Sequence, residues 1–315
     1  MKLHRPKHNW CYYAFGSISL CMIMRDSAKT LSRCLDSVRG LVSEIIIVDT
    51  GSVDNSVNIA RSYGAQVYSD PWQNDFARPR NIGIEKARGQ WILIMDPDET
   101  ISKKDHIKVK TLTQIKKYDA FLLTTFNYGP FSRDPKYKII PNGKDPTGKF
   151  PGYTPSTKTR FFRNGLGIKF EGCWHELVDW YIIRHKLLMA KSPVPVHHWN
   201  HEIAQVSMLH KRQFYLRMGE KKVGQWPRSG KAHWELAVAE MAHKYFYRAH
   251  NSILKAIQYG FDGKDQFFAL ARCYRELGNK PLADFSFEKA TCHLFPSLTH
   301  IDPQKKTLSR LTAQP

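Results

Sequence analysis

The sequence predicts an α/β protein with a mainly parallel sheet, helices on both faces of that sheet, and a small all-α region towards the C-terminal end. Short apolar runs alternate with segments of helical periodicity through residues 17–100, and this alternation is typical of parallel sheets. Two of the runs end in aspartates, at the edge where such sheets bind ligands. The last third of the chain has an internal period of 34 residues, the length of a helix-pair repeat.

The elements expected in the sheet follow one another in a regular order. Apolar, β-rich runs predict the strands, and apolar residues at helical spacing, such as Leu31, Leu35 and Val38, predict the helices. Ser27 is the expected N-cap of the first helix. The predicted strands are residues 17–24, 44–49, 65–68 and 91–95, and the predicted helices are residues 28–38, 53–63 and 76–87.

Residues 127–158 differ in character from the segments before them. They are rich in Gly, Pro, Lys and aromatic residues and show no periodicity. A loop of this length inside a compact domain is usually functional or disordered, and we expect a binding loop or lid here. Beyond it, residues 159–162 and 168–170 are predicted to form short strands.

The C-terminal third repeats a pattern of packing residues that matches the tetratricopeptide motif. The recurring residues are Leu236, Ala249 and Ala256, followed 34 positions later by Leu270, Ala283 and Ala290. Two copies are too few for a free-standing solenoid, so we expect them to dock on the preceding domain or on a second subunit. The predicted division is an N-terminal extension (1–16), an α/β domain (17–205) and a helical tetratricopeptide-like region (206–315).

The charge of the chain is concentrated in its second part. The formal net charge is +20, and residues 100–315 hold 36 Lys/Arg against 17 Asp/Glu. This excess fits a polyanionic partner, either nucleic acid or an anionic membrane surface, and it also fits a generally basic soluble protein. None of the six cysteines lies in a metal-binding spacing, which argues against a zinc module and favours the reducing cytosol.

The distribution of apolar residues predicts neither a signal peptide nor a membrane-spanning helix. The basic N-terminus and the apolar run after it lack a small-residue cleavage site, so we interpret the run as the first strand and not as a signal peptide. No stretch approaches 18 apolar residues. We therefore expect a cytoplasmic protein. Homo-oligomers and peripheral contact with an anionic membrane both stay open.

The strongest chemical signal is the Asp96-Pro97-Asp98 turn directly after the fourth predicted strand. Pro97 favours a turn that brings the two carboxylates together. Paired carboxylate oxygens suit Mg²⁺ or Mn²⁺, with phosphates completing the coordination shell. The alternative is an acidic turn at a helix start, and Glu99 is expected to cap the next helix in this way.

Three motifs in the first hundred residues, IVDTGS, FARPRN and ILIMDPDE, form one recognisable set. Together with residues 159–178 and 193–200 they resemble family 2 glycosyltransferases of the GT-A fold. The most similar branch includes lipopolysaccharide-core glucosyltransferases and peptide S-glycosyltransferases with tetratricopeptide-like tails. The resemblance implies inverting transfer of a hexose from a nucleotide diphosphate sugar, such as UDP-glucose, with Mn²⁺ or Mg²⁺ as cofactor.

The resemblance also implies roles for residues on the donor side. Asp49 would contact the base or ribose of the nucleotide, and Asp54 would support the same loop. Arg80 and Asn81 would steady the diphosphate, and Asp96 would lie beside it.

The remaining roles implied by the resemblance concern the cation and the reacting groups. Asp96 and Asp98 would hold the metal, with Asp98 as the direct ligand. His198, in the segment VHHWN, would be a third metal ligand. Glu176, at the end of FEGCWHE, would be the general base that takes the proton of the acceptor. Non-functional interpretations stay open. Glu176 could be a surface carboxylate, and His197 and His198 could be packing or loop residues.

The predicted loop and Arg160 just after it suggest what the acceptor is. Seven Lys/Arg are interleaved there with five Tyr/Phe, a mixture suited to phosphate contacts and base stacking. We expect Lys136, Lys138, Tyr153 and Trp174 to contact the acceptor. The leading hypothesis is a hydroxymethylated pyrimidine in phage DNA, because such a base offers a hydroxyl nucleophile and would be flipped into the site.

Two other kinds of acceptor and one non-catalytic function are also compatible with the sequence. The acceptor could be a lipopolysaccharide core, cell-wall glycan or glycolipid at an anionic membrane. It could also be a peptide held by the helical repeats. A different class altogether is a non-catalytic binding module on a degenerate transferase fold, although the intact aspartates and the Arg80-Asn81 pair argue against it.

Overall fold

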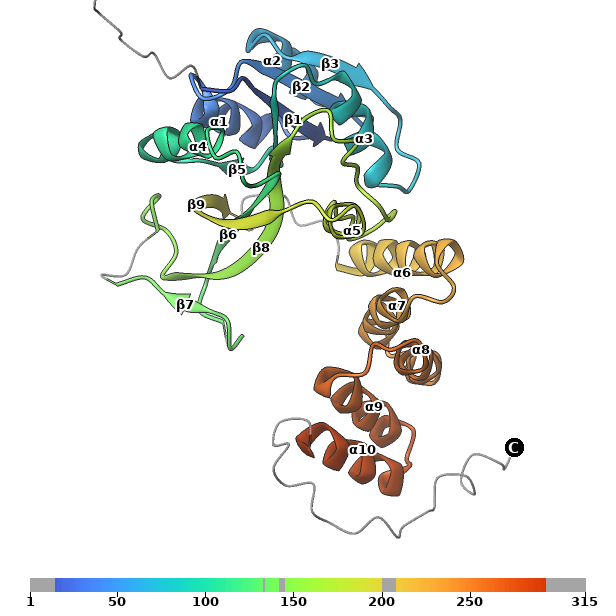
Figure 1. Ribbon diagram of the computed structural model, residues 1–315. Coiled ribbons are helices and arrows are strands. Elements are labelled where there is room, and N and C mark those ends of the chain that lie inside the picture. Colours follow the sequence, from blue (N-terminus) through green and yellow to red (C-terminus); the bar gives the residue numbers. More distant parts are fainter. Residues whose placement is uncertain (1–14, 133, 142–144, 200–207, 293–315) are drawn as a thin grey trace, which may run out of the picture. The chain divides into compact units, whose positions relative to one another are not determined.

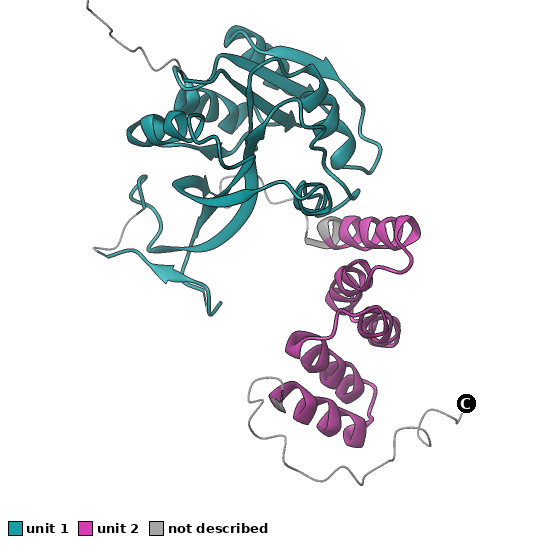
Figure 2. Ribbon diagram, in the orientation of Figure 1, with its two compact units in different colours: residues 1–204 teal, residues 205–315 magenta. Residues whose placement is uncertain are grey.

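The computed structural model describes residues 15–132, 134–141, 145–199 and 208–292. The chain divides into two compact units, Met1–Ala204 (unit 1) and Gln205–Pro315 (unit 2), which are coloured separately in Figure 2. The expected N-terminal extension falls almost wholly outside the described residues.

Unit 1 is built on one mixed sheet (Figure 1). Its strands are β1 (Ile18–Met24), β2 (Glu44–Asp49), β3 (Gln66–Ser69), β4 (Trp91–Ile94), β5 (Glu99–Thr100), β6 (Ala120–Gly129), β7 (Lys138–Ile139), β8 (Gly152–Arg163) and β9 (Met189–Trp199). Their order is β3-β2-β1-β4-β8-β6-β9-β5, and β7 pairs with β8. The predicted α/β class is confirmed. The first four strands are parallel, as are β6 and β9, whereas β8 runs antiparallel to both of its neighbours β4 and β6.

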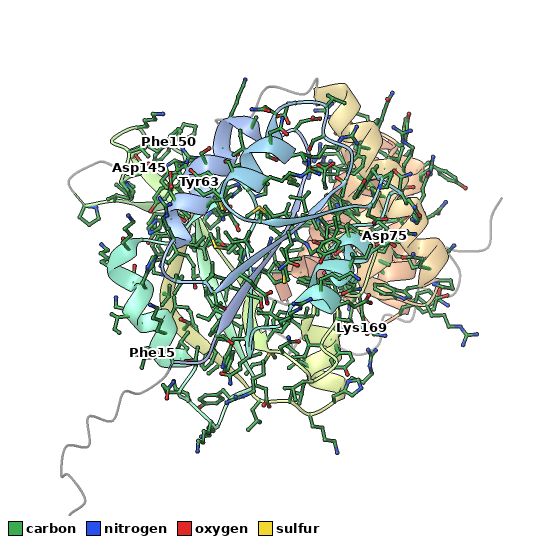
Figure 3. The ribbon with its side chains drawn as sticks, turned by 90° about the horizontal axis from the view of Figure 1, so that it is seen from above. Phe15, Tyr63, Asp75, Asp145, Phe150 and Lys169 are labelled. Atoms are coloured by element: carbon green, nitrogen blue, oxygen red, sulfur yellow. The ribbon has the colours of Figure 1, made fainter. Side chains whose placement is uncertain are left out.

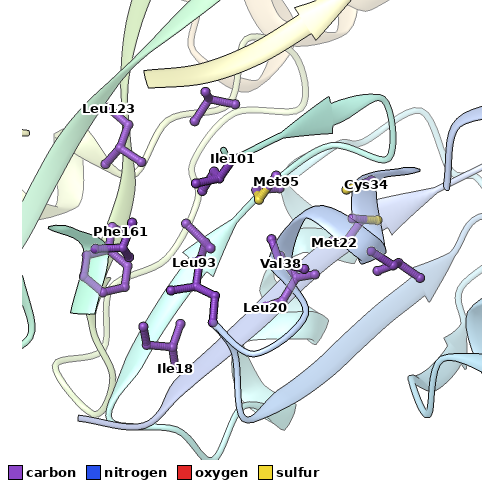
Figure 4. Close-up of a cluster of buried hydrophobic side chains, with 14 of the residues drawn as sticks. Ile18, Leu20, Met22, Cys34, Val38, Leu93, Met95, Ile101, Leu123 and Phe161 are labelled. Carbon is purple, nitrogen blue, oxygen red and sulfur yellow. The ribbon is translucent and has the colours of Figure 1, made fainter. Parts of the chain in front are cut away.

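Helices cover both faces of this sheet. They are α1 (Ala28–Val38), α2 (Ser56–Ser62), α3 (Ala77–Lys86), α4 (His106–Leu112) and α5 (Asp179–Arg184), with a 3₁₀ turn at Lys103–Asp105. Successive residues of a strand point to opposite faces. Leu20 and Met22 of β1 therefore pack in one buried cluster with Val38 of α1 (Figure 4), while Cys21 packs in another with Ile182 of α5.

Two expectations for the middle of the chain are wrong. Residues 127–158 are not one long loop, because they contain the end of β6, the whole of β7 and the first part of β8. The pairings that form these strands join residues far apart in sequence, which local periodicity does not reveal. The strand expected at 168–170 does not form, since Phe170 bonds its backbone N–H and C=O to the side chain of Asn81.

Unit 2 is helical throughout its described residues. Its helices are α6 (Met208–Gln225), α7 (Gly230–Ala242), α8 (Phe246–Gln258), α9 (Lys264–Glu276) and α10 (Lys280–Cys292). The pair α9–α10 begins 34 residues after the pair α7–α8, and all six recurring Leu and Ala residues are buried. Within the described part of the chain, no helix has the length and apolar character that crossing a bilayer requires.

Candidate active site

Two acidic strand ends meet at one edge of the sheet. Asp49 is the last residue of β2 and pairs with Met24, the last residue of β1. Asp96 follows β4 closely, and Ile94 of that strand pairs with Cys21 of β1. Because β1 lies between β2 and β4, the two aspartates flank the carboxyl end of the central strand. Ligands of parallel α/β sheets bind at this edge.

The Asp49 carboxylate organises the turn that follows it. It accepts hydrogen bonds from the backbone N–H groups of Gly51 and Ser52, both at 3.2 Å. The hydroxyl of Ser52 donates to it as well. Asp49 is buried, so its oxygens are held in one orientation at the edge of the sheet.

The start of α1 is capped from a neighbouring loop. Ser27 occupies the N-cap position, as predicted, but its hydroxyl donates to the carbonyl of Arg25 and does not cap the helix. Asp54 accepts a hydrogen bond from the backbone N–H of Ala28 at 3.0 Å. Burial would raise the pKa of Asp54, but hydrogen bonds from Ser56 and Ala28 lower it. Asp54 thus joins the loop after β2 to the first turn of α1.

Arg80 links two carboxylates from different elements. Its Nε donates to Glu176 Oε1 at 2.7 Å, and its Nη2 donates to Asp96 Oδ1 at 2.9 Å. Its Nη1 is buried and has no hydrogen-bond partner among the described residues. Burial would raise the pKa of Asp96, but the charges of Arg80, Arg160 and Lys158 bring it well below its usual range. All five residues line a small cavity of about 30 Å³.

A second contact joins Asp98 to β9, the last strand in chain order. The β5–β9 pairing places His198 opposite Glu99. His198 Nε2 lies 3.1 Å from Asp98 Oδ2, and its Nδ1 lies 2.8 Å from Asn127 Oδ1. The amide nitrogen of Asn127 donates to the carbonyl of Thr154, which turns its oxygen towards His198. Burial would lower the pKa of His198, but the hydrogen bond and charge of Asp98 raise it.

A buried ion pair adjoins the Asp96 turn. Glu99 accepts two hydrogen bonds from Arg160, at 2.6 and 2.7 Å, and the two side chains are 2% and 5% exposed. Glu99 Oε2 also accepts the backbone N–H of Asp96 at 2.9 Å. The expectation that Glu99 caps a helix is therefore wrong, because Glu99 lies in β5. Arg160, one of the seven cations counted near the predicted loop, is held in this buried pair, because a buried guanidinium requires a carboxylate partner.

The side chain of Asn81 contacts the segment that leads to Glu176. Both polar groups of its side chain bond the backbone of Phe170, at 2.8 and 3.0 Å. Phe170 begins the segment that ends in Glu176, and the Arg80 guanidinium lies 5.4 Å from the Phe170 ring. Asn81 therefore positions the segment of Glu176, and its expected role in steadying the diphosphate stays a prediction.

The cation ligands expected from the sequence are not assembled as a group of three. Asp98 and His198 contact each other, but Asp96 is paired with Arg80. In the part of the chain that the structure describes, no three His, Cys, Asp or Glu side chains are grouped so that they could hold a metal ion. A three-residue site would require Asp96 to leave Arg80.

The residues expected to contact the acceptor lie in two places. Lys136, Lys138 and Tyr153 line one groove. Trp174 is 7% exposed and stacks on His175, with ring centroids 4.1 Å apart. Trp174 is thus a packing residue of the Glu176 segment and does not line the groove of the other three.

Asp145 anchors the end of β9 beside His198. It is buried and lies next to Phe150 (Figure 3). Its carboxylate accepts hydrogen bonds from the hydroxyl of Thr147, the backbone N–H groups of Lys149 and Phe150, and the indole of Trp199. Burial would raise the pKa of Asp145, but these hydrogen bonds lower it to about 2.

The low pKa of Asp145 predicts a pH-dependent contribution to stability. The folded state favours the ionised carboxylate, so the stabilisation is complete above the ordinary pKa near 4 and is lost as the pH falls through about 2. An Asp145→Asn variant should be about 2 kcal/mol less stable than the parent at pH 6, and this difference should shrink by about half at pH 3. Urea unfolding at both pH values measures it. An equal difference at the two pH values would contradict the assignment.

Known proteins resemble about half of this chain. Over 166 residues it is 35% identical to a TPR repeat-containing protein of Synechococcus elongatus, a match covering 53% of this chain and 36% of that protein. Over 162 residues it is 26% identical to the SPbeta prophage-derived glycosyltransferase SunS of Bacillus subtilis, covering 51% and 34%. The match thus spans about a third of the length of these relatives.

A solved structure also aligns with this chain. The crystal structure of S. aureus TarS 1-349 with UDP-GlcNAc aligns with a TM-score of 0.49 and 14% identity, over 87% of this chain and 91% of that one.

The family comparison covers the segment that forms most of the site. The model of the family "Glycosyl transferase family 2" matches residues 19–174. That stretch includes Asp49, Arg80, Asp96 and Asp98. Residues 19–174, about half of the chain, are therefore similar to Glycosyl transferase family 2 domains.

Proposed function

We propose that unit 1 is a cation-dependent glycosyltransferase that moves a sugar from a nucleotide diphosphate sugar to a hydroxyl acceptor. The observation that supports this best is the contact of Asp98 with His198, at the edge where Arg80 links Asp96 and Glu176. A carboxylate and an imidazole suit Mn²⁺, with Mg²⁺ as the alternative. A guanidinium suits a phosphate.

The donor set around His198 fits such a cation. The hydrogen bond from Nδ1 to Asn127 leaves Nε2 as the nitrogen that faces Asp98, which is the usual arrangement for a metal-binding histidine. Nε2 and Asp98 Oδ2 are 3.1 Å apart. Adjacent ligands of an octahedral ion with bonds near 2.1 Å are separated by about 3.0 Å. The two side chains thus have a spacing that a single cation can bridge.

Arg80 supplies a reason for Asp96 to join them. A diphosphate near the unpartnered Nη1 of Arg80 would compete with Asp96 for the guanidinium. We propose that donor binding releases Asp96 towards Asp98, so that the site with Asp96, Asp98 and His198 forms only when the donor is present. The cation, when bound, neutralises the diphosphate as leaving group.

The remaining residues have complementary proposed roles. Glu176 is the proposed general base in an inverting single displacement, held in place through Arg80 and through the segment that Asn81 fixes. Asp49 and Asp54 shape the turn after β2, where the proposed nucleoside pocket lies.

For the acceptor we propose a hydroxymethylated pyrimidine in DNA, because the excess of positive charge begins after residue 100. A lipopolysaccharide core, a cell-wall glycan or a peptide is the alternative, and the relative named a glycosyltransferase of prophage origin does not decide between them. A catalytically inactive binding module is the remaining alternative.

A thermal-shift screen of nucleotide sugars tests the donor side directly. One nucleotide sugar should raise the unfolding temperature by several degrees at about 100 times its dissociation constant, and only when Mn²⁺ or Mg²⁺ is present. Mass spectrometry of hydroxymethylated DNA, glycan and peptide incubated with that donor should then show one product with an added hexose. No shift with any nucleotide sugar and cation would overturn the proposal.

A further inference from the structure

A groove of about 520 Å³ lies on the face of the sheet away from His198. Phe126 and Asn127 are neighbours in β6, so their side chains point to opposite faces. Asn127 contacts His198, whereas Phe126 lines the groove. The groove is therefore separate from the candidate active site, and no role on the donor side involves it.

The floor of the groove combines aromatic rings with hydroxyl groups. Phe126 and Tyr153 stack with their ring centroids 4.2 Å apart and their planes at 22°. Beside them, the hydroxyls of Thr124 and Thr157 are 3.1 Å apart. Strand pairing fixes this arrangement, since Thr124 lies between Thr157 of β8 and Pro195 of β9. Two central strands of the sheet thus hold a rigid, flat platform.

Three lysines surround this floor. Lys136, Lys138 and Lys191 line the groove and are exposed. None of the described residues that line it is acidic, and no described carboxylate forms an ion pair with any of the three. Lys138 stands directly opposite Tyr153 in the β7–β8 pairing, so a cation and an aromatic ring lie side by side.

We propose that this groove binds a single-stranded nucleic acid as a second site for the acceptor strand. Lysines that follow a phosphate backbone, with aromatic side chains on which bases stack, are the features of single-strand binding sites. A concave groove suits a chain better than it suits the flat surface of a membrane. The inference rests on the proposed function only where it names the bound strand as the acceptor, because binding needs neither donor nor cation.

The test compares two triple variants that remove the same charge. The groove variant carries Lys136→Ala, Lys138→Ala and Lys191→Ala. The control carries Lys103→Ala, Lys104→Ala and Lys116→Ala, three exposed lysines of unit 1 outside the groove. Binding of a labelled 20-nucleotide oligo(dT) is followed by fluorescence anisotropy between 50 and 200 mM salt, and circular dichroism checks that both variants fold.

The groove variant should bind oligo(dT) at least about 10-fold more weakly than the parent at low salt. The slope of log K against log salt should fall by about 2, because three phosphate contacts are lost at about 0.7 each. The control should stay close to the parent. Equal losses in the two variants would overturn the proposal, as would unchanged oligo(dT) binding with loss of binding to vesicles containing phosphatidylserine.

The two proposals can fail separately. Hydrolysis of a nucleotide sugar without acceptor should be the same in the parent, the groove variant and the control. Absence of hydrolysis in all three, together with selective loss of oligo(dT) binding in the groove variant, would remove the proposed transfer reaction and leave the nucleic-acid site standing.

Discussion

An Asp98→Asn variant is expected to lose at least about 100-fold of its cation-dependent hydrolysis of nucleotide sugars while keeping its fold. Asparagine can still accept a hydrogen bond from His198 Nε2 at the observed 3.1 Å. It lacks the negative charge that a hard cation requires. Loss of residues that only orient metal ligands already costs 10- to 100-fold, so loss of a direct ligand should cost more. Release of nucleoside diphosphate over a Mn²⁺ titration measures the effect.

Asp36→Asn is the matched control for this change. Asp36 is an exposed aspartate on α1, so its substitution removes the same charge from a nearby helix without touching the turn. The control should retain parental hydrolysis at every Mn²⁺ concentration. Hydrolysis by Asp98→Asn within 3-fold of the parent would show that Asp98 does not hold the cation.

Breaking the buried Glu99–Arg160 pair should give the largest loss of stability, and the loss should be asymmetric. Glu99→Ala leaves the Arg160 guanidinium buried without its partner, at a cost of about 3–5 kcal/mol. Arg160 cannot release its proton. Arg160→Met should cost less, because Glu99 can become neutral. Burial already raises the pKa of Glu99, and the charge of Arg160 opposes that rise.

Urea unfolding of the two single variants and of the double variant Glu99→Leu/Arg160→Met measures this asymmetry. The double variant should recover most of the stability, because no charge is then left buried. Without the charge of Arg160 the pKa of Glu99 should rise further, so Arg160→Met should gain stability relative to the parent as the pH falls and Glu99 is protonated. Equal costs for both single variants at all pH values would contradict the argument.

The sequence predicted strands β1–β4 and the helices between them well, because their signals are local. Parallel strands with covering helices leave a pattern within each segment, so residues 44–49 and 28–38 were predicted at the bounds that the structure has. The placement of Asp49 and Asp96 at one edge follows from the same pattern. Ser27 shows its limit, because the hydrogen bond that caps α1 comes from Asp54 in another loop.

The second half of the sheet could not be predicted in the same way. Pro155, Pro193 and Pro195 lie within β8 and β9, and proline argues against a central strand when only the sequence is known. Asn127 was missed because it fell in a segment that was expected to be a loop. The alternation around it, with Phe126 and Tyr128 as aromatic neighbours, was the available signal for a strand.

The contact between Asp98 and His198 joins residues that are 100 positions apart, and this separation matters while the chain is being made. At about 5–20 residues per second, on the order of 5–20 s pass between the synthesis of the two ligands. During that time β9 cannot yet pair with β5 and β6. A nascent chain can thus present the turns for the nucleotide before it can present both proposed ligands of the cation. Under the proposed mechanism, the cation site is therefore completed only after β9 has been synthesised, and a shorter nascent chain should not hydrolyse nucleotide sugar.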